Sequence, residues 1–359
     1  MAKFLLFSDI HVHPHKQKTE RLHDCLKALN WCFEVAEENS VNAILFGGDL
    51  LHERQKLDSM TYVEVFKILD KWKSKNRPVY LLVGNHDMWF ANAWTISSIY
   101  PFRAIENYYV VDQTQSINIA GVEWHFMPYT HNPIEELEKL PKNKVGKSYF
   151  LGHLAIDGAK LNSAGSISDV AIEHDGDMVK VEADFFKKYK RSFFGHYHGA
   201  QKLAKNVEYI GSPLQLSFGE ANETKHVIIL NSDDDSVNYV ENNFSPKHFY
   251  LNENNFREFD QSILAKSYVD FSISDSSDIE LKKQLEKFTE DSKVANLRIR
   301  CEPKKIQEHV ISDVKKIISD EASLLSNYLK QEQNTDLDKD VLLEIGNKII
   351  SFAQNEEGK

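Results

Sequence analysis

The sequence predicts an α/β fold for its first half, in which a mostly parallel sheet is covered by helices. Two observations carry this prediction: short apolar runs that end in Gly, Asp, Asn or His, and amphipathic stretches at helical spacing that alternate with them. A βαβαβ order of this kind implies parallel strands that are joined by right-handed crossovers. With 42% hydrophobic and 27% charged residues, the 359-residue chain can bury a sizeable core beneath a charged surface.

Three strands and two helices are expected before residue 108. Residues 3–8, 43–46 and 79–83 are apolar runs typical of buried strands, whereas apolar side chains at helical spacing predict helices over 19–39 and around 62–72. The three strands end in Asp9-Ile10-His11, Gly47-Gly48-Asp49 and Gly84-Asn85-His86-Asp87.

After about residue 108 the pattern changes to strands with few helices. The expected strands are 116–119, 122–127, 148–151, 191–194, 208–210 and 226–230. Two of these runs are followed by Gly152-His153 and Gly195-His196-Tyr197-His198. The segment 157–175 is rich in Gly, Ser and Ala and is therefore expected to form a long surface loop.

The chain is expected to contain a main domain over 1–245, a small unit over 246–303 and a helical tail over 304–359. At about 150 residues per domain, this length predicts roughly two domains and a remainder. Asp, Asn and Ser crowd together over 231–246, which indicates a break. Beyond it, residues 268–273, 279–288 and 296–301 predict a strand, a helix and a strand.

Charge and composition exclude several classes of protein. The net charge of −11 argues against electrostatic wrapping of nucleic acid, which needs clustered Lys and Arg. No apolar run approaches the roughly 18 to 20 residues of a membrane-spanning helix, and the apolar start is too short for a signal-peptide core. The 3 cysteines cannot form a disulfide framework, so we expect a cytoplasmic protein.

The strand ends carry residue types that bind metals. Polar groups at the carboxyl ends of parallel strands converge on one crevice, even when they are far apart in the sequence. Seven donors are too many for one tetrahedral zinc site of about four ligands, but they suit two divalent ions with a bridging carboxylate. Mixed carboxylate, amide and imidazole ligation favours Mn²⁺, Fe²⁺ or Zn²⁺ over Mg²⁺. The donors are Asp9, His11, Asp49, Asn85, His153, His196 and His198.

Each motif alone has a simpler structural explanation. Asp49 could cap a turn, a single Asn-His-Asp could form a turn, and His153 could be an ordinary polar residue. Five such strand ends in one chain favour the metal site. His13 and His15 are instead expected to be exposed loop residues, because Pro14 ends the strand. The aromatic residues Trp89, Phe90 and Trp94 could either stack on bases or pack in the core.

The order and spacing of these motifs resemble those of the calcineurin-like metallophosphoesterase superfamily. The matching residues are D-x-H at 9–11, G-D at 48–49, G-N-H-D at 84–87, G-H at 152–153 and G-H-x-H at 195–198. Within the superfamily, the chain resembles the SbcD family of DNA-repair nucleases, which includes bacteriophage recombination endonuclease subunits. Supporting segments are Gly-Gly-Asp-Leu-Leu-His at 47–52 and Tyr-Ile-Gly-Ser-Pro at 209–213. The resemblance covers residues 1–230 well and the remainder more loosely.

This resemblance implies a four-layer α+β sandwich flanked by helices, with a small α/β cap domain and a C-terminal helical tail. It also implies a role for each predicted site residue. His86 would contact the phosphate and assist the leaving oxygen, and His52 would lie near the scissile group. Asp87 argues against the protein-phosphatase branch, which has Gly-Asn-His-Glu. By resemblance, Asp9, His11 and His198 hold one ion, Asn85, His153 and His196 hold the other, and Asp49 bridges them.

The resemblance implies a DNA exonuclease and endonuclease that acts in repair, recombination and replication through a water activated by two ions, with Mn²⁺ favoured. The expected partners are DNA, an SbcC-type SMC-like ATPase that binds the C-terminal helices, and a second copy of the chain, all in the cytoplasm at the nucleoid. Two divalent ions bring +4 and the ligands Asp9 and Asp49 bring −2, so the cleft would attract phosphate locally.

Two alternatives remain open. A free-standing phosphoesterase that acts on nucleotides or other small phosphoesters would share the whole metal site, and only the region after residue 245 discriminates it. A scaffold with a decayed site is the second alternative. The presence of all seven expected ligands and of His86 counts against it.

Overall fold

The computed structural model describes residues 2–14, 19–73, 77–89, 96–141, 146–160, 181–256, 259, 261–274, 279–301, 341–343 and 345. The chain forms two compact units, one of residues 1–272 and 278–300 and the other of residues 273–277 and 301–359. The elements described below are those of the first unit. Most of the expected loop 157–175 and of the expected helical tail 304–359 lies outside the described residues.

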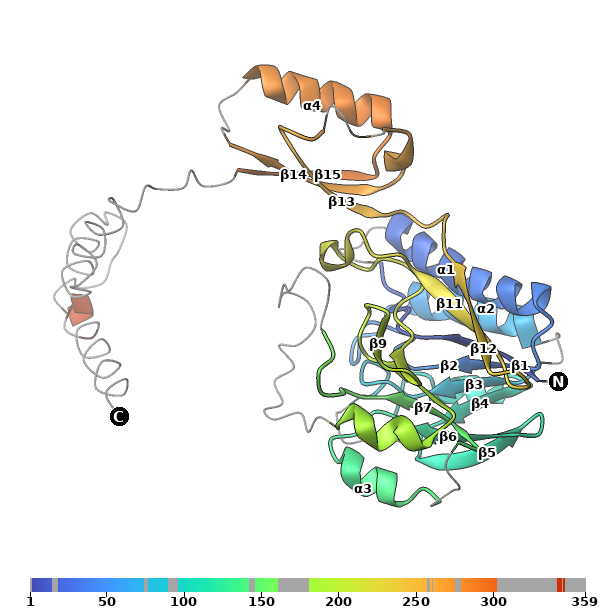
Figure 1. Cartoon of the computed structure of the whole chain (residues 1–359). Helices are drawn as coiled ribbons and strands as arrows, with labels where there is room; N and C mark the ends of the chain where they lie inside the picture. Colours follow the sequence, from blue (N-terminus) through green and yellow to red (C-terminus); the bar gives the residue numbers. More distant parts are fainter. Residues whose placement is uncertain are drawn as a thin grey trace. The chain divides into compact units, whose positions relative to one another are not determined.

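The first sheet has six strands in the order β12-β11-β1-β2-β3-β4. Strands β1 to β4 run parallel, and β11 pairs antiparallel with β1 and β12. Helices α1 (Thr19–Glu38) and α2 (Ser59–Trp72) cover one face of this sheet (Figure 1). Because both faces are covered, the central strands are continuous apolar runs. The strands are β1 (Lys3–Phe7), β2 (Ala43–Phe46), β3 (Val79–Leu82), β4 (Tyr108–Val111), β11 (His226–Asn231) and β12 (Ser236–Glu241).

The second sheet also has six strands, in the order β5-β6-β7-β8-β10-β9. Alternate side chains of the two sheets meet in a shared core, where Phe4 and Phe193 both pack against the fully buried Trp124. The strands are β5 (Gln115–Ile119), β6 (Val122–Met127), β7 (Tyr149–His153), β8 (Arg191–Gly195), β9 (Gln201–Ala204) and β10 (Val207–Tyr209).

A third core lies on the outer face of the second sheet. Phe150 and Phe194 of that sheet pack against Phe186 of a short 3₁₀ helix (Ala183–Lys188), and Leu137 of α3 (Pro133–Glu138) joins them. Three cores in succession therefore separate four layers, helix, sheet, sheet and helix. The predicted α/β fold class with a four-layer sandwich is confirmed.

A small third sheet contains β13 (His248–Asn252), β14 (Tyr268–Ile273) and β15 (Asn296–Cys301), accompanied by α4 (Ile279–Ser292). The ring of Phe256 contacts Phe271 of β14 and Phe288 of α4, so that the helix and the sheet share an apolar core. The strand, helix and strand expected over 268–301 are confirmed. The boundaries of the three expected domains stay predictions.

The polar segment 231–246, where a break is expected, contains β12, which forms a hairpin with β11. Its polar residues belong to the hairpin turn, where Asp234 accepts hydrogen bonds from the backbone N–H and the hydroxyl of Ser236. Among the described helices, none has the length and apolar character needed to cross a membrane.

Candidate metal centre

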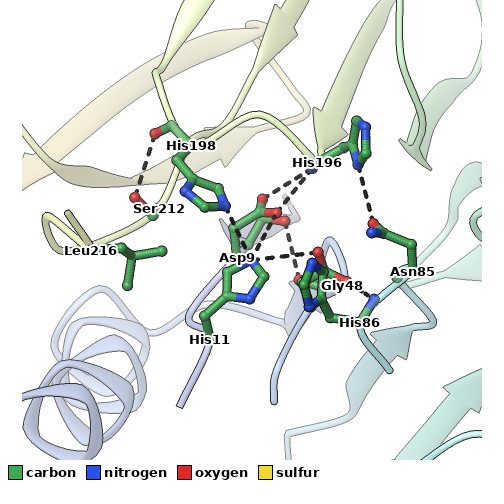
Figure 2. Close-up of polar contacts among 12 residues, drawn as sticks. Asp9, His11, Gly48, Asn85, His86, His196, His198, Ser212 and Leu216 are labelled. Carbon is green, nitrogen blue, oxygen red and sulfur yellow. Dashed lines mark hydrogen bonds and ion pairs between the residues drawn. The ribbon is translucent and has the colours of Figure 1, made fainter. Parts of the chain in front are cut away.

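The loops that follow five strands bring all seven predicted donors together. β1 precedes Asp9 and His11, β2 precedes Asp49, and β3 precedes Asn85; β7 ends at His153, and β8 precedes His196 and His198. Six of the seven are buried and His198 is partly buried, although they come from positions spread over 190 residues of sequence. Figure 2 shows how several of their side chains point toward one another.

Two donor sets can be distinguished by distance. In the first, the Nε2 atoms of His11 and His198 are 3.1 Å apart, and His11 Nε2 is 4.0 Å from Asp9 Oδ1. In the second, Asn85 Oδ1 is 2.9 Å from His153 Nε2 and 3.1 Å from His196 Nδ1. These sets correspond to the two groups of ligands that the motifs predict.

Asp49 lies between the two sets. Its Oδ2 atom is 3.5 Å from His11 Nε2 and 3.3 Å from His153 Nε2, so one carboxylate oxygen faces both. Its Oδ1 atom accepts a hydrogen bond from the backbone N–H of His86 at 2.8 Å. The position therefore suits the bridging role that the resemblance implies for Asp49.

The donor spacing fits bound divalent ions. Ligands about 2.1 Å from an ion lie roughly 3.0 to 3.4 Å from one another in octahedral or tetrahedral shells. The observed separations of 2.9 to 3.5 Å agree, apart from the longer one to Asp9. Two imidazole nitrogens at 3.1 Å repel each other unless a proton or a cation lies between them.

Burial keeps two of the imidazoles in the neutral form that metal ligation requires. It lowers the pKa of His11 well below its usual value, with the nearby His86 adding to the effect, and it lowers the pKa of His196 to about 3. Burial also opposes the charge of His153, but the carboxylates of Asp49 and Asp9 outweigh it and raise that pKa to about 9. The charges of Asp49 and Asp9 therefore determine the protonation of His153 as strongly as its burial does.

Four of the predicted ligands have a backbone conformation that L-residues rarely adopt. The φ angles are 53° at Asp9, 46° at His11, 60° at Asp49 and 99° at His196. Backbone hydrogen bonds hold the first two loops together, from Asp9 N to Gly48 O at 2.9 Å and from His11 N to Asp49 O at 3.1 Å. Such conformations persist only where the surrounding structure enforces them, and they concentrate at functional sites.

Two glycines allow the loops to approach closely. A Cβ atom on Gly84 would collide with the Oδ1 and backbone nitrogen atoms of Asp49, and one on Gly48, whose φ is +105°, would collide with the ring of His153. The Gly-Asp and Gly-Asn-His-Asp motifs therefore contain glycine because the loops after β2 and β3 nearly touch.

The sequence did not reveal the structural role of Asp87. Its buried carboxylate accepts hydrogen bonds from the backbone N–H groups of Asp49 at 2.8 Å, of Leu50 at 3.0 Å and of Gly84 at 3.0 Å. One side chain thereby joins the loops after β2 and β3. Its place in the motif was visible, but its partners are backbone groups that only the folded chain brings near.

The two predicted catalytic histidines lie beside the first donor set. The rings of His52 and His86 stack with centroids 5.5 Å apart, and the ring of His86 is 4.7 Å from that of His11. His86 Nδ1 is 2.7 Å from the backbone oxygen of His52, and His52 Nδ1 is 3.4 Å from His11 Nδ1. Both side chains are half-buried, so they can meet a substrate that enters from solvent.

His13 is a loop residue as expected, but it is partly buried and not exposed. Its side chain is 21% exposed, its Nε2 atom is 3.3 Å from a carboxylate oxygen of Glu53, and its ring lies 4.9 Å from that of His52. β1 ends at Phe7, and His13 follows the isolated bridge between Val12 and Leu51, which places its ring beside His52. Trp89 is 45% exposed and is therefore not a core residue; His15, Phe90 and Trp94 lie outside the described residues.

This arrangement can support phosphoester hydrolysis. Divalent ions held by these donors would supply Lewis-acid activation of a phosphate ester and of water. The chain itself supplies buried donors in a fixed geometry, together with two half-buried histidines that could exchange protons with a bound substrate.

Comparison with known proteins agrees with this geometry. Residues 2–200 match the model of the calcineurin-like phosphoesterase family. The chain is similar to putative phosphoesterase 244L of Invertebrate iridescent virus 6, with 24% identity over 66% of this chain and 79% of that protein. It is 22% identical to exonuclease subunit 1 of Enterobacteria phage T4 over 61% of each chain. It is also 22% identical to the SbcD component of the nuclease SbcCD from Escherichia coli K12 over 67% of each chain. The chain therefore belongs to the calcineurin-like phosphoesterase family.

Proposed function

We propose that the protein is a metal-dependent DNA nuclease that hydrolyses phosphodiester bonds with two divalent ions, Mn²⁺ being favoured. The observation that carries the proposal is the position of Asp49 Oδ2, which faces His11 at 3.5 Å and His153 at 3.3 Å. A shared carboxylate between two sets of buried donors is what a two-ion site requires. The mixed imidazole, amide and carboxylate donors suit Mn²⁺, Fe²⁺ or Zn²⁺ better than Mg²⁺, and the resemblance to the SbcD family favours Mn²⁺ among them.

The site residues have two proposed roles: some bind the ions and others transfer protons or contact the substrate. Asp9, His11 and His198 hold one ion, and Asn85, His153 and His196 hold the other. His86 is half-buried next to this site, where it contacts the phosphate and donates a proton to the departing oxygen, while His52 lies near the scissile group. The backbone N–H of His86 donates a hydrogen bond to Asp49. This bond fixes the position of the His86 side chain relative to the metal ligands.

DNA is the proposed substrate because two relatives are named as nuclease subunits. In the same proposal the protein works in DNA repair, recombination and replication as the partner of an SbcC-type ATPase, which binds residues 304–359. Residues 246–303 face the DNA, the nuclease acts as a homodimer within the complex, and the complex is cytoplasmic and associated with the nucleoid.

An assay of substrate range tests the proposal. The full chain with Mn²⁺ is incubated with double-stranded DNA, with single-stranded DNA and with bis-p-nitrophenyl phosphate, in parallel with Asp49→Asn. We expect the wild-type protein to cleave DNA and the variant to cleave none of the three substrates. Hydrolysis of the small ester without any cleavage of DNA would favour the free-standing phosphoesterase, and no hydrolysis at all would contradict both functions.

A further inference from the structure

We propose that Glu220, held in place by Lys225, is a positioning residue that fixes the ring of His198 and makes the two ion sites unequal. The inference rests on the proposed function, because it takes His198 to be a metal ligand. Its structural basis is a buried network of hydrogen bonds and an ion pair behind the first donor set, in which Glu220 and Lys225 lie outside the segments that carry the resemblance.

The network begins at the side of the His198 ring that faces away from the other donors. Nε2 points to His11 at 3.1 Å, whereas Nδ1 is 3.0 Å from Glu220 Oε1. Glu220 is 2% exposed, so it is present as a carboxylate only because other groups compensate its charge. A carboxylate on Nδ1 accepts the Nδ1–H proton and thereby leaves the lone pair of Nε2 available to an ion.

Lys225 supplies the compensating charge. Its Nζ atom is 2.6 Å from Glu220 Oε2 and donates to the backbone oxygen of His198 at 2.9 Å. The same lysine therefore holds the carboxylate and the backbone of the residue that the carboxylate orients. Lys225 is 6% exposed, and the pair is largely shielded from water.

Two further donors fix the second oxygen of Glu220. The hydroxyl of Ser212 donates to Oε2 at 3.1 Å, and the backbone N–H of Leu216 donates to it at 3.2 Å. Figure 2 shows Ser212 and Leu216 beside His198, with the Ser212 hydroxyl also directed at the His198 backbone. The single hydroxyl proton of Ser212 is shared with Leu214 O at 2.9 Å, so Lys225 and the Leu216 N–H are the principal donors that keep Oε2 in place and Oε1 on His198.

The other predicted histidine ligands are supported differently. His153 Nδ1 is 2.7 Å from the neutral backbone oxygen of Gly47, and His11 Nδ1 is 3.4 Å from His52 Nδ1. Of the four predicted histidine ligands, all within the described residues, His198 alone has a carboxylate on the nitrogen that faces away from the donors. A carboxylate partner makes an imidazole a stronger donor than a carbonyl partner does, so the first site should bind its ion more tightly through Glu220.

Titration of the full chain with Mn²⁺, followed by calorimetry and by metal content after dialysis, tests the inference. His198→Asn and His153→Asn identify which binding step belongs to which site. We expect Glu220→Gln to weaken the step that His198→Asn abolishes by about 10- to 100-fold, and to leave the other step within about twofold. Glu208→Gln is the matched control, because Glu208 is also buried but accepts a hydrogen bond from the Tyr239 hydroxyl of β12 and has no contact with His198 among the interactions described.

A second pair of variants separates positioning from folding. Lys225→Met removes the cation that pairs with Glu220 and with Glu223 and should lower the thermal midpoint, whereas Glu220→Gln with Lys225→Met should recover part of this stability but not first-site affinity. Recovery of both stability and first-site affinity in the double variant would overturn the inference, as would unchanged binding by Glu220→Gln.

The same titration separates the inference from the proposed function. If the wild-type chain binds fewer than two ions, the proposed function fails together with the inference. If it binds two ions and Glu220→Gln binds both normally, only the inference fails.

Discussion

Asp49 is the residue on which the predicted two-ion site depends most, because one of its oxygens faces both donor sets. Replacing Asp49 with Asn keeps the shape of the side chain but removes its charge and one oxygen lone-pair donor. We expect Asp49→Asn to weaken the binding of both ions by at least about tenfold, which corresponds to about 1.4 kcal/mol each. Calorimetric titration with Mn²⁺ measures both steps.

Asp70→Asn serves as the control for this change, since Asp70 lies in an exposed ion pair with Lys73. Two ions that bind Asp49→Asn with wild-type affinity would show that Asp49 does not bridge.

His86 should matter for turnover rather than for ion binding. In His86→Ala the backbone N–H that bonds to Asp49 remains, so the ligand geometry is kept while the imidazole is lost. Loss of a general acid typically costs a factor of about 10² to 10⁴ in rate. We therefore expect DNA cleavage to fall by that factor at unchanged metal content, with the exposed His23→Ala as control. Full activity in His86→Ala would end the assignment.

At the scale of elements, the site depends on loops that are held close together against their local preference. Four predicted ligands have positive φ angles. Asp87 joins the loops after β2 and β3 by hydrogen bonds, and these loops lie so close together that only glycine fits at position 84. The strands supply the rigid frame that enforces this arrangement.

Gly84→Ala tests the close approach directly. Its Cβ would meet the carboxylate and backbone nitrogen of Asp49, so the β3 loop must shift. We expect a loss of about 1 to 3 kcal/mol in unfolding free energy, as for other overpacked sites, together with weaker Mn²⁺ binding. Gly199→Ala is the control, because a Cβ there meets nothing closer than a Glu223 oxygen at 3.4 Å. Equal stability and affinity in the two variants would contradict the steric argument.

The sequence predicted the central elements better than the peripheral ones, for a physical reason. The bounds of β2 and β6 were predicted as observed, and both strands lie in the interior of their sheets. The strands that were missed, β4, β9, β12 and β13, all lie at the edge of a sheet. Edge strands pair on one side only, and β9 and β12 carry polar residues that weaken their apolar signal, although the edge strands β5 and β15 were predicted.

The same distinction applies to the candidate site. The seven donors and His86 were predicted because each directly follows or ends a strand and sits in a short motif. The orienting contacts of Glu220 with His198 and of Asp87 with three backbone N–H groups were not predicted. Glu220 is 22 residues from His198 in the sequence. A single glutamate outside any motif gives no sequence pattern from which its contact in the fold could be predicted.

At the scale of the whole molecule, a net charge of −11 has to be reconciled with a DNA substrate. Divalent ions can draw a phosphodiester into the site locally, but they cannot hold many base pairs of DNA against a surface of like charge. A partner that supplies positive surface resolves this conflict. The segment 304–359 is where such a partner is proposed to bind.

The sequence of this segment supports the last prediction. One apolar stripe at helical spacing lies between residues 306 and 328, a polar stretch follows at 331–336, and a second stripe lies between 337 and 352. Two short amphipathic helices cannot bury both stripes against each other alone, so they need another surface. That surface is either the nuclease domain of the same chain or the coiled coil of an ATPase partner.

Deletion of residues 304–359 distinguishes these two surfaces. If the segment docks on the ATPase, the truncated chain should keep its thermal midpoint and hydrolyse bis-p-nitrophenyl phosphate at the wild-type rate, yet no longer co-purify with the ATPase. A matched full-length control replaces Ile345 and Val341 with Asp, which removes apolar character from the second stripe without shortening the chain. A truncated protein that unfolds would show that the segment packs on its own nuclease domain. Undiminished binding of the ATPase by the truncated chain would place the docking surface elsewhere, because no apolar stripe of the tail would then remain to bind.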